Sequence, residues 1–128
     1  MSDTPRFAPG TICWQDLTVP NAEEVRDFYA AVVGWTWLGE DMGGYEDYHM
    51  LPPGSDKSAA GVCHARGCNA DVPPQWLVYI NVADMAQSVA KVRELGGEVV
   101  VEPRGMGPGL FAVIRDPAGA MCALYQPS

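Results

Sequence analysis

The side chains best suited to bind a metal gather near the middle of the chain. His49, Cys63, His64 and Cys68 offer imidazole and thiol groups, which are the borderline and soft ligands that zinc prefers. The Cys-x4-Cys spacing is not that of a common zinc knuckle, and Cys68 falls in a segment expected to be a linker. We therefore predict that these four residues have structural or incidental roles.

Two further motifs could carry chemistry. Asp47, Tyr48 and His49 could form a hydrogen-bonded cluster, but neighbouring residues of a strand point to opposite faces, which disfavours a catalytic pair. The glycine-rich run at 105–109 is not followed by a helix, and Pro108 lacks an amide donor, so it does not predict a phosphate-binding loop. The run is typical of a flexible hairpin, and a lid over a binding site is one hypothesis for it.

Composition restricts the partners that we expect. The chain has 8 basic and 16 acidic residues and a net charge of −8, so its surface repels phosphate backbones and anionic lipids. We predict no nucleic-acid or membrane partner. No apolar run could span a bilayer and residues 1–10 lack an apolar signal core, which makes the cytoplasm the default location. The 4 cysteines are expected to be reduced.

An internal repeat with an offset of about 63 residues organises the chain. Each copy predicts one helix, with Asn21 as the N-cap of the first and Asp84 as the N-cap of the second. Gly34 is predicted to close the first helix, and the pair Gly96-Gly97 is predicted to end the second, with Gly97 one repeat from Gly34. Apolar residues at helical spacing predict a buried stripe on each helix: Ala22, Val25, Phe28, Tyr29 and Val32, then Met85, Val89, Val92 and Leu95.

The strand candidates complete a βαβββ order in both copies. They lie at 11–19, 35–38, 45–51 and 59–65, then at 76–82, 98–101, 110–115 and 121–126. We predict an α+β fold whose two modules form a curved, mixed-sheet trough suited to a ligand. The chain is expected to be one domain, 1–128, with modules at about 9–65 and 75–127 and a linker at 66–74. The alternative is a two-layer domain whose open sheet face packs on a partner chain.

Several short runs, in their order and spacing, resemble a known family. Thr18-Val19, Asp27-Phe28-Tyr29 and Val33-Gly34-Trp35 are similar to the opening of the vicinal oxygen chelate superfamily, which has the glyoxalase/bleomycin resistance/dihydroxybiphenyl dioxygenase fold. The stretch at 115–120 is similar to its second module. Cys13-Trp14-Gln15-Asp16-Leu17 further resembles an actinobacterial-type branch that is labelled glyoxalase-like or hydroxylase. The resemblance covers residues 9–127.

This resemblance implies a divalent metal on the concave face that acts as a Lewis acid towards two neighbouring substrate oxygens. Its ligands would come from the first and last strands of each module. Carried over, three of them fall on Trp14, Leu77 and Ala123, and the fourth lies within 61–64. Those three side chains cannot bind a hard or borderline metal, so we predict no metal and no cofactor. A register slip to Gln15 would restore only one ligand.

The same register sorts the side chains that would face the trough. The predicted ligand-binding residues are Trp14, Thr18, Leu77, Tyr79, Asn81, Met121, Ala123 and Tyr125. They suit an aromatic or uncharged organic ligand. Asp16 is the candidate catalytic residue, because aromatic walls would raise the pKa of its carboxyl group towards that of a general acid or base. Its alternative role is a structural hydrogen bond.

Three functions follow from these expectations. The first is a small-molecule-binding protein without a metal, comparable to the antibiotic-binding members of the superfamily. The second is an enzyme, metal-dependent or metal-free, of the lyase, isomerase or hydroxylase-like type. The third is a regulatory or assembly module that binds a partner chain. A homodimer is expected, because an open trough and open sheet edges would expose apolar surface.

Overall fold

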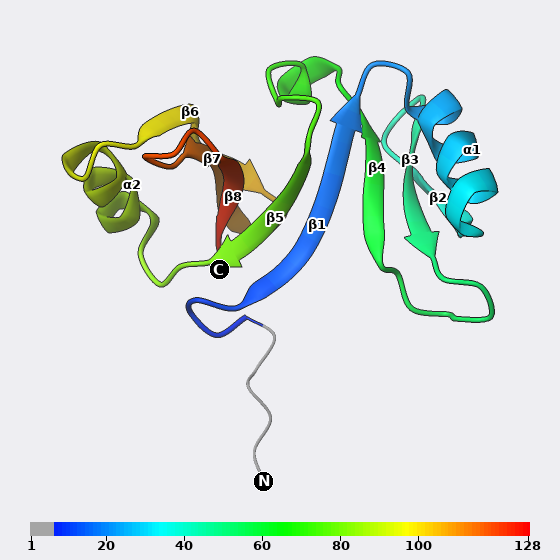
Figure 1. The fold of residues 1–128 in the computed structure, drawn as a ribbon, viewed down its shortest axis with the longest axis horizontal. Helices are drawn as coiled ribbons and strands as arrows, with labels where there is room; N and C mark the ends of the chain where they lie inside the picture. Colours follow the sequence, from blue (N-terminus) through cyan, green and yellow to red (C-terminus); the bar gives the residue numbers. More distant parts are fainter. Residues whose placement is uncertain (1–6) are drawn as a thin grey trace, which may run out of the picture. The chain divides into compact units, whose positions relative to one another are not determined.

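The structure, a computed structural model, describes residues 7–128 apart from the side chain of Cys68. That part of the chain forms two α-helices, one short 3-10 helix and eight strands, in the order βαβββ twice (Figure 1). The α+β class and the order of elements in each module are as predicted. By their contacts, the residues form two compact units. We call Gln15–Trp76 the N-terminal unit, and Leu77–Ser128 together with the residues up to Trp14 the C-terminal unit.

The N-terminal unit is a mixed four-stranded sheet with one helix. β1 (Ile12–Val19), which crosses the unit boundary, runs parallel to β4 (Ala60–His64). β3 (Glu46–Leu51) pairs antiparallel with β4 and with the edge strand β2 (Thr36–Asp41). α1 (Ala22–Val33) covers one sheet face (Figure 1). The core beneath the helix consists of Leu17, Val19, Ala22, Tyr48, Met50 and Val62.

Asn21 occupies the N-cap position of α1 as predicted, but its side chain makes no cap bond to the helix, because its Nδ2 donates instead to Glu24 Oε1 at 3.0 Å. The predicted buried stripe is wider than the surface that the sheet covers, so Phe28 and Val32 are 57% and 60% exposed. Gly34 closes the helix as predicted, with a φ of 79° and its N–H donating to the carbonyl of Ala30.

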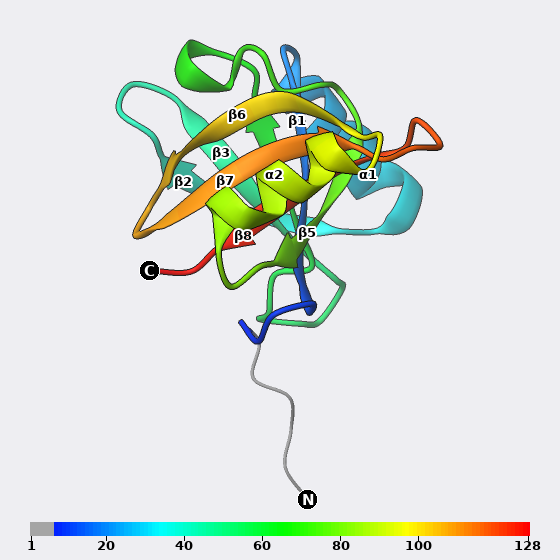
Figure 2. The same ribbon diagram turned by 90° about the vertical axis from the view of Figure 1, so that its left-hand side faces the viewer.

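The C-terminal unit repeats this plan. β5 (Trp76–Asn81) runs parallel to β8 (Met121–Gln126), which pairs antiparallel with β7 (Gly109–Arg115). β6 (Glu98–Met106) pairs antiparallel with β7 and forms the edge. α2 (Met85–Glu94) lies across β6, β7 and β8 (Figure 2). Its core consists of Met85, Val89, Ala112 and Leu124, packed against Ile80, Val82, Val99 and Ile114.

The ends of α2 and the following hairpin refine the sequence prediction. Asp84 caps α2 as predicted, because its side chain accepts a hydrogen bond from the amide of Gln87. The pair Gly96-Gly97 ends the helix as predicted: Gly96 is the left-handed residue, with a φ of 91°, and Gly97 donates to the carbonyl of Val92. β6 continues to Met106 through two register shifts, so the run at 105–109 lies in the β6–β7 hairpin.

The predicted linker at 66–74 contains the short 3-10 helix Gly67–Asn69. Neither α-helix in the described part of the chain has the length and apolar character needed to cross a membrane.

Candidate functional site

Most of the predicted ligand-binding residues lie on one sheet face of the C-terminal unit. Tyr79 is opposite Ala123, and Asn81 is opposite Tyr125, in the parallel β5–β8 pair. Leu77 and Met121 share this face by strand alternation. The intervening residues Ile80 and Leu124 pack against α2, so these six side chains occupy the helix-free face. Ligand binding by them stays a prediction.

The β6–β7 hairpin adds residues to this face that the sequence did not reveal. Phe111 is opposite Tyr125, and Val113 is opposite Ala123. Arg104 on β6 is in turn opposite Phe111. Alternation along 110–115 could have found Phe111 and Val113 once β7 was paired with β8. Arg104 could not have been found in this way, because the register shifts in β6 change which side chains face the same side.

An aromatic pair forms the centre of the helix-free face. The rings of Tyr79 and Phe111 are stacked, with centroids 5.9 Å apart and an interplanar angle of 18°. Their residues are only 4% and 2% exposed. The guanidinium of Arg104 lies 5.4 Å from the centroid of the Phe111 ring, within the range of a cation–π interaction. The half-buried Arg104 therefore lies against a buried aromatic pair.

The half-buried Tyr125 lies opposite Phe111 on the helix-free face. Its ring centroid is 6.2 Å from that of Phe7. A Cβ atom placed on Gly109 would lie 2.7 Å from the Tyr125 hydroxyl and 2.4 Å from the backbone oxygen of Gln126. Only glycine fits there, so the hairpin backbone at Gly109 approaches the tyrosine closely.

Asn81 is held in place from several directions. It is 1% exposed, and its Oδ1 accepts a hydrogen bond from the Cys13 thiol at 3.2 Å. Its backbone N–H donates to the carbonyl of Thr11, and its carbonyl accepts from the amide of Gly10. Asn81 therefore anchors the segment before β1 to β5. Cys13 serves here as a polar partner of the asparagine.

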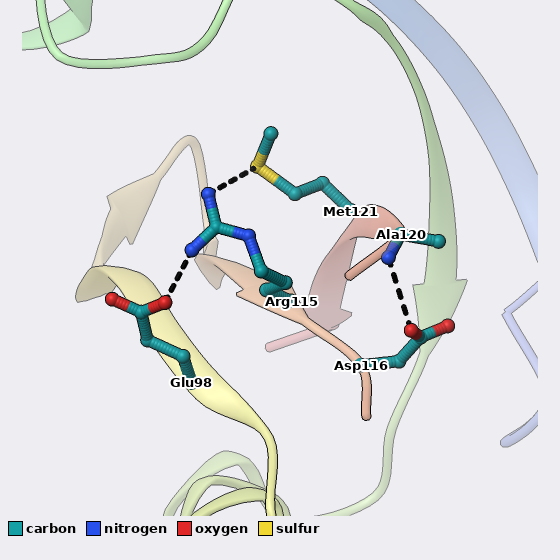
Figure 3. Close-up of polar contacts among 5 residues, drawn as sticks. All are labelled: Glu98, Arg115, Asp116, Ala120 and Met121. Carbon is teal, nitrogen blue, oxygen red and sulfur yellow. Dashed lines mark hydrogen bonds and ion pairs between the residues drawn. The ribbon is translucent and has the colours of Figure 1, made fainter. Parts of the chain in front are cut away.

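A second arginine marks the other end of the helix-free face (Figure 3). Arg115 donates from Nη1 to Glu98 Oε1, and its Nη2 lies 3.8 Å from the sulfur of Met121. The adjoining Asp116 accepts hydrogen bonds at Oδ1 from the amides of Ala118 and Ala120, at 2.8 and 3.0 Å. The Asp-Pro-Ala-Gly motif thus builds the β7–β8 turn, and the carboxylate of Asp116 is engaged in its backbone.

Asp16 and Thr18 lie on the helix-free face of the N-terminal unit. Leu17 and Val19 pack under α1, and Thr18 is opposite Cys63 in the register of β1 and β4. Burial raises the pKa of the Cys63 thiol, and the negative charges of Asp16 and Asp47 raise it further. The thiol therefore stays protonated near neutral pH, which makes Cys63 a poor nucleophile and a poor metal ligand.

The two histidines pair with separate carboxylates. His49 Nε2 is 2.6 Å from Glu40 Oε1. His64 Nδ1 is 3.3 Å from Oδ1 of the buried Asp47, which also accepts from the backbone amide of His64 at 2.8 Å. Among residues 7–128, no group of three His, Cys, Asp or Glu side chains is arranged to hold a metal. The Cys68 side chain in the zinc hypothesis lies outside the described residues.

The residues at the positions implied for the superfamily's metal do not fit it. Leu77 and Ala123 have hydrocarbon side chains, and both are buried in the C-terminal unit. Trp14, half-buried in the same unit, offers an indole without a lone pair for a metal. In the fourth region, Cys63 is protonated and His64 is paired with Asp47. The donor set therefore lacks the carboxylates and free imidazoles that a divalent metal needs.

Comparison with curated proteins gives relatives of about twice the length. The chain is 32% identical over 124 residues to "Putative glyoxylase CFP32" of Mycobacterium tuberculosis, covering 93% of this chain and 45% of that protein. It is 32% identical over 133 residues to the anthracycline biosynthesis protein DnrV of Streptomyces peucetius, covering 94% of this chain and 48% of that protein. The chain therefore spans about half the length of these relatives.

Solved structures share the fold. Methylmalonyl-CoA epimerase from Mycobacterium tuberculosis matches with a TM-score of 0.52 and 17% identity, covering 94% of this chain and 92% of that one. The hypothetical protein BH1468 from Bacillus halodurans matches with a TM-score of 0.54 and 14% identity, covering 89% of this chain and 91% of that one. At this identity the likeness concerns the fold alone.

The family assignment rests on nearly the whole chain. The family model matches residues 11–124, which include every strand of both modules except the last two residues of β8. Two βαβββ modules, the relatives and the shared fold all agree with it. The chain belongs to the Glyoxalase/Bleomycin resistance protein/Dioxygenase superfamily.

Proposed function

We propose that this chain binds a small aromatic molecule without a metal, on the helix-free face of its C-terminal unit. The observation that carries the proposal is the stacked pair Tyr79 and Phe111 with the Arg104 guanidinium over the Phe111 ring. The buried Tyr79 and Phe111 support Arg104, whose half-buried guanidinium can stack on a ligand ring or donate to its oxygens. The half-buried Tyr125 and Met121 offer further contact surface.

The absence of suitable donors favours binding over metal-assisted chemistry. Leu77 and Ala123 contribute shape and apolar surface where the superfamily's metal would need ligands. The relative DnrV is named for anthracycline biosynthesis, and anthracyclines are fused-ring aromatic compounds with several oxygens. A ligand of this kind would use both the aromatic and the arginine side chains of the face. The predicted aromatic or uncharged ligand class is therefore retained in the proposal.

The test is a titration with doxorubicin, a fluorescent anthracycline, monitored by fluorescence after the protein has been treated with a chelator. We expect saturable binding with one molecule per chain, unchanged when nickel, zinc or iron(II) is added. Arg104→Ala should weaken binding about tenfold, since an aromatic–cation contact of about 1.4 kcal/mol is lost. Arg93→Ala is the matched control, because Arg93 lies on α2 and pairs with Glu102. Equal affinities for the two variants, or binding only with added metal, would contradict the proposal.

The alternative is an enzyme that uses Asp16. This carboxylate faces the same side of the N-terminal sheet as Cys63. Its negative charge, together with that of Asp47, raises the pKa of the Cys63 thiol. A protonated thiol gives this group of side chains no nucleophile. Binding is therefore favoured. A slow absorbance change of the bound doxorubicin that Asp16→Asn abolishes would instead identify an enzyme.

A further inference from the structure

A separate cavity lies on the opposite side of the C-terminal sheet. It has a volume of about 490 Å³ and lies between α2 and the β7–β8 turn. Val92 and Leu95 of α2, Ile114 of β7, Pro117 of the turn and Leu124 of β8 line it. Because these side chains are apolar and Leu95 is 68% exposed, the cavity leaves hydrocarbon surface in contact with water. This volume lies within the range of small-molecule sites.

The internal repeat shows what the N-terminal unit places at the same position. Val92 on α2 corresponds to Tyr29 on α1, at the offset of about 63 residues. The centroids of Tyr29 and Trp35 are 5.7 Å apart, and Trp76 contacts both rings at 5.4 and 6.0 Å. The N-terminal unit thus fills the space beside its helix with aromatic rings. In the C-terminal unit, the smaller Val92 leaves that space open.

Hydrogen bonding supports an indole-like occupant. In the N-terminal unit, Trp76 Nε1 donates to the hydroxyl of Tyr29 at 2.9 Å. Ser88 and Gln87, on the same helical face as Val92, line the cavity and offer side-chain oxygens that could accept an N–H in the same way. An aromatic ring with one donor would therefore match both the apolar lining and its polar edge.

The charged residues at the cavity favour an uncharged ligand. Lys91 Nζ is 3.2 Å from Glu94 Oε2. Arg115 directs its guanidinium towards Glu98, on the helix-free side of the sheet (Figure 3). Asp116 is occupied by the amides of the turn. With these charges paired, a charged ligand would gain little.

We infer that this α2 cavity is a second binding site, which takes an uncharged, indole-sized aromatic molecule in the place beside the helix that the ring of Tyr29 fills in the other module. The site does not depend on the proposed function, because its residues lie on the helix side of the sheet. The two sites can therefore be tested separately.

The experiment uses indole as the probe, titrated into the isotope-labelled full chain and followed by amide NMR shifts. We expect saturable shifts centred on Val92, Leu95 and Ile114. Val92→Tyr introduces the residue that the other module carries, and it should fill the cavity and weaken indole binding at least tenfold. Ala90→Tyr adds the same side chain at an exposed position of α2 outside the cavity, and should leave binding unchanged.

Two further variants keep the outcome decisive. Leu95→Glu places a charge on a residue that is already exposed, so it should fold and also weaken indole binding, even if Val92→Tyr does not fold. Arg104→Ala should not change indole binding, which separates this site from the one proposed for doxorubicin. The inference is overturned if no saturable shifts occur, if they centre on Phe111 and Tyr125, or if the Val92 and Ala90 variants bind equally.

Discussion

At the scale of single residues, the structure predicts an alkaline loss of stability at Cys63. Burial and the charges of Asp16 and Asp47 raise the pKa of this thiol in the folded protein. A group whose folded pKa is raised gives full stability below its unfolded pKa, about 8.5 for cysteine, and loses it as the pH rises towards the folded pKa. This part of the free energy of unfolding should fall by at most about 1.4 kcal/mol per pH unit above that point.

Urea unfolding of wild type and Cys63→Ala, from neutral pH to about pH 10, would measure this effect. The variant starts less stable because a buried side chain is truncated, so the slope against pH is the decisive quantity. Wild type should show the steeper decline. The buried Tyr48 and the half-buried Cys122 also have raised pKa values, and they contribute equally to both proteins. Parallel curves would show that Cys63 ionises in the folded state as easily as in the unfolded chain.

Residue positions were predictable where a local rule decides them. The alternation of side chains along a strand is enough to predict that Tyr79 and Asn81 lie on one face of β5 and Ile80 on the other. The strand pairing and the packing of Ile80 against α2 agree with this prediction. The surroundings of Asp16 were not predictable, because Cys63 and Asp47 reach it through the pairing of strands distant in sequence. Arg104 was missed for a related reason, since the irregularities of β6 alter its alternation.

At the scale of elements, the two helix starts provide a matched test of capping. Asp84 accepts a hydrogen bond from the amide of Gln87, whereas Asn21 makes no side-chain cap bond to its helix. Asp84→Ala should therefore lower the free energy of unfolding by about 1 kcal/mol. Asn21→Ala should cost clearly less, because only an exposed contact with Glu24 is lost. Thermal or urea unfolding would compare them, and equal losses would refute the assignment of the caps.

Element order was predictable because caps, glycines and apolar periods repeat along the chain. Element ends were less so: β6 was expected to stop near Val101 but continues to Met106. Its glycine and proline residues suggested a loop, whereas pairing with β7 holds them in a strand as far as Met106 and leaves the turn at Gly107 and Pro108. A lid over a binding site therefore stays a hypothesis about this hairpin.

At the scale of the whole molecule, we propose that two copies of this chain associate through α1. Phe28, Val32 and Val33 of α1 are exposed although they are large and apolar. A second copy could cover these side chains and remove their hydrocarbon surface from water. The curated relatives are about twice as long as the stretch that they share with this chain, so two copies would supply a comparable number of modules.

Light scattering of the full chain should therefore give the mass of a dimer. The double variant Phe28→Lys/Val32→Lys should be monomeric, because the charges would lie in the centre of the contact and would need to lose their water. Glu23→Lys changes the net charge by the same amount on the opposite side of α1, and it should leave the dimer intact. A monomeric wild type would rule out the association. A dimer that both variants retain would place the contact elsewhere, since a surface containing Phe28 could not bury two lysines without a large loss of affinity.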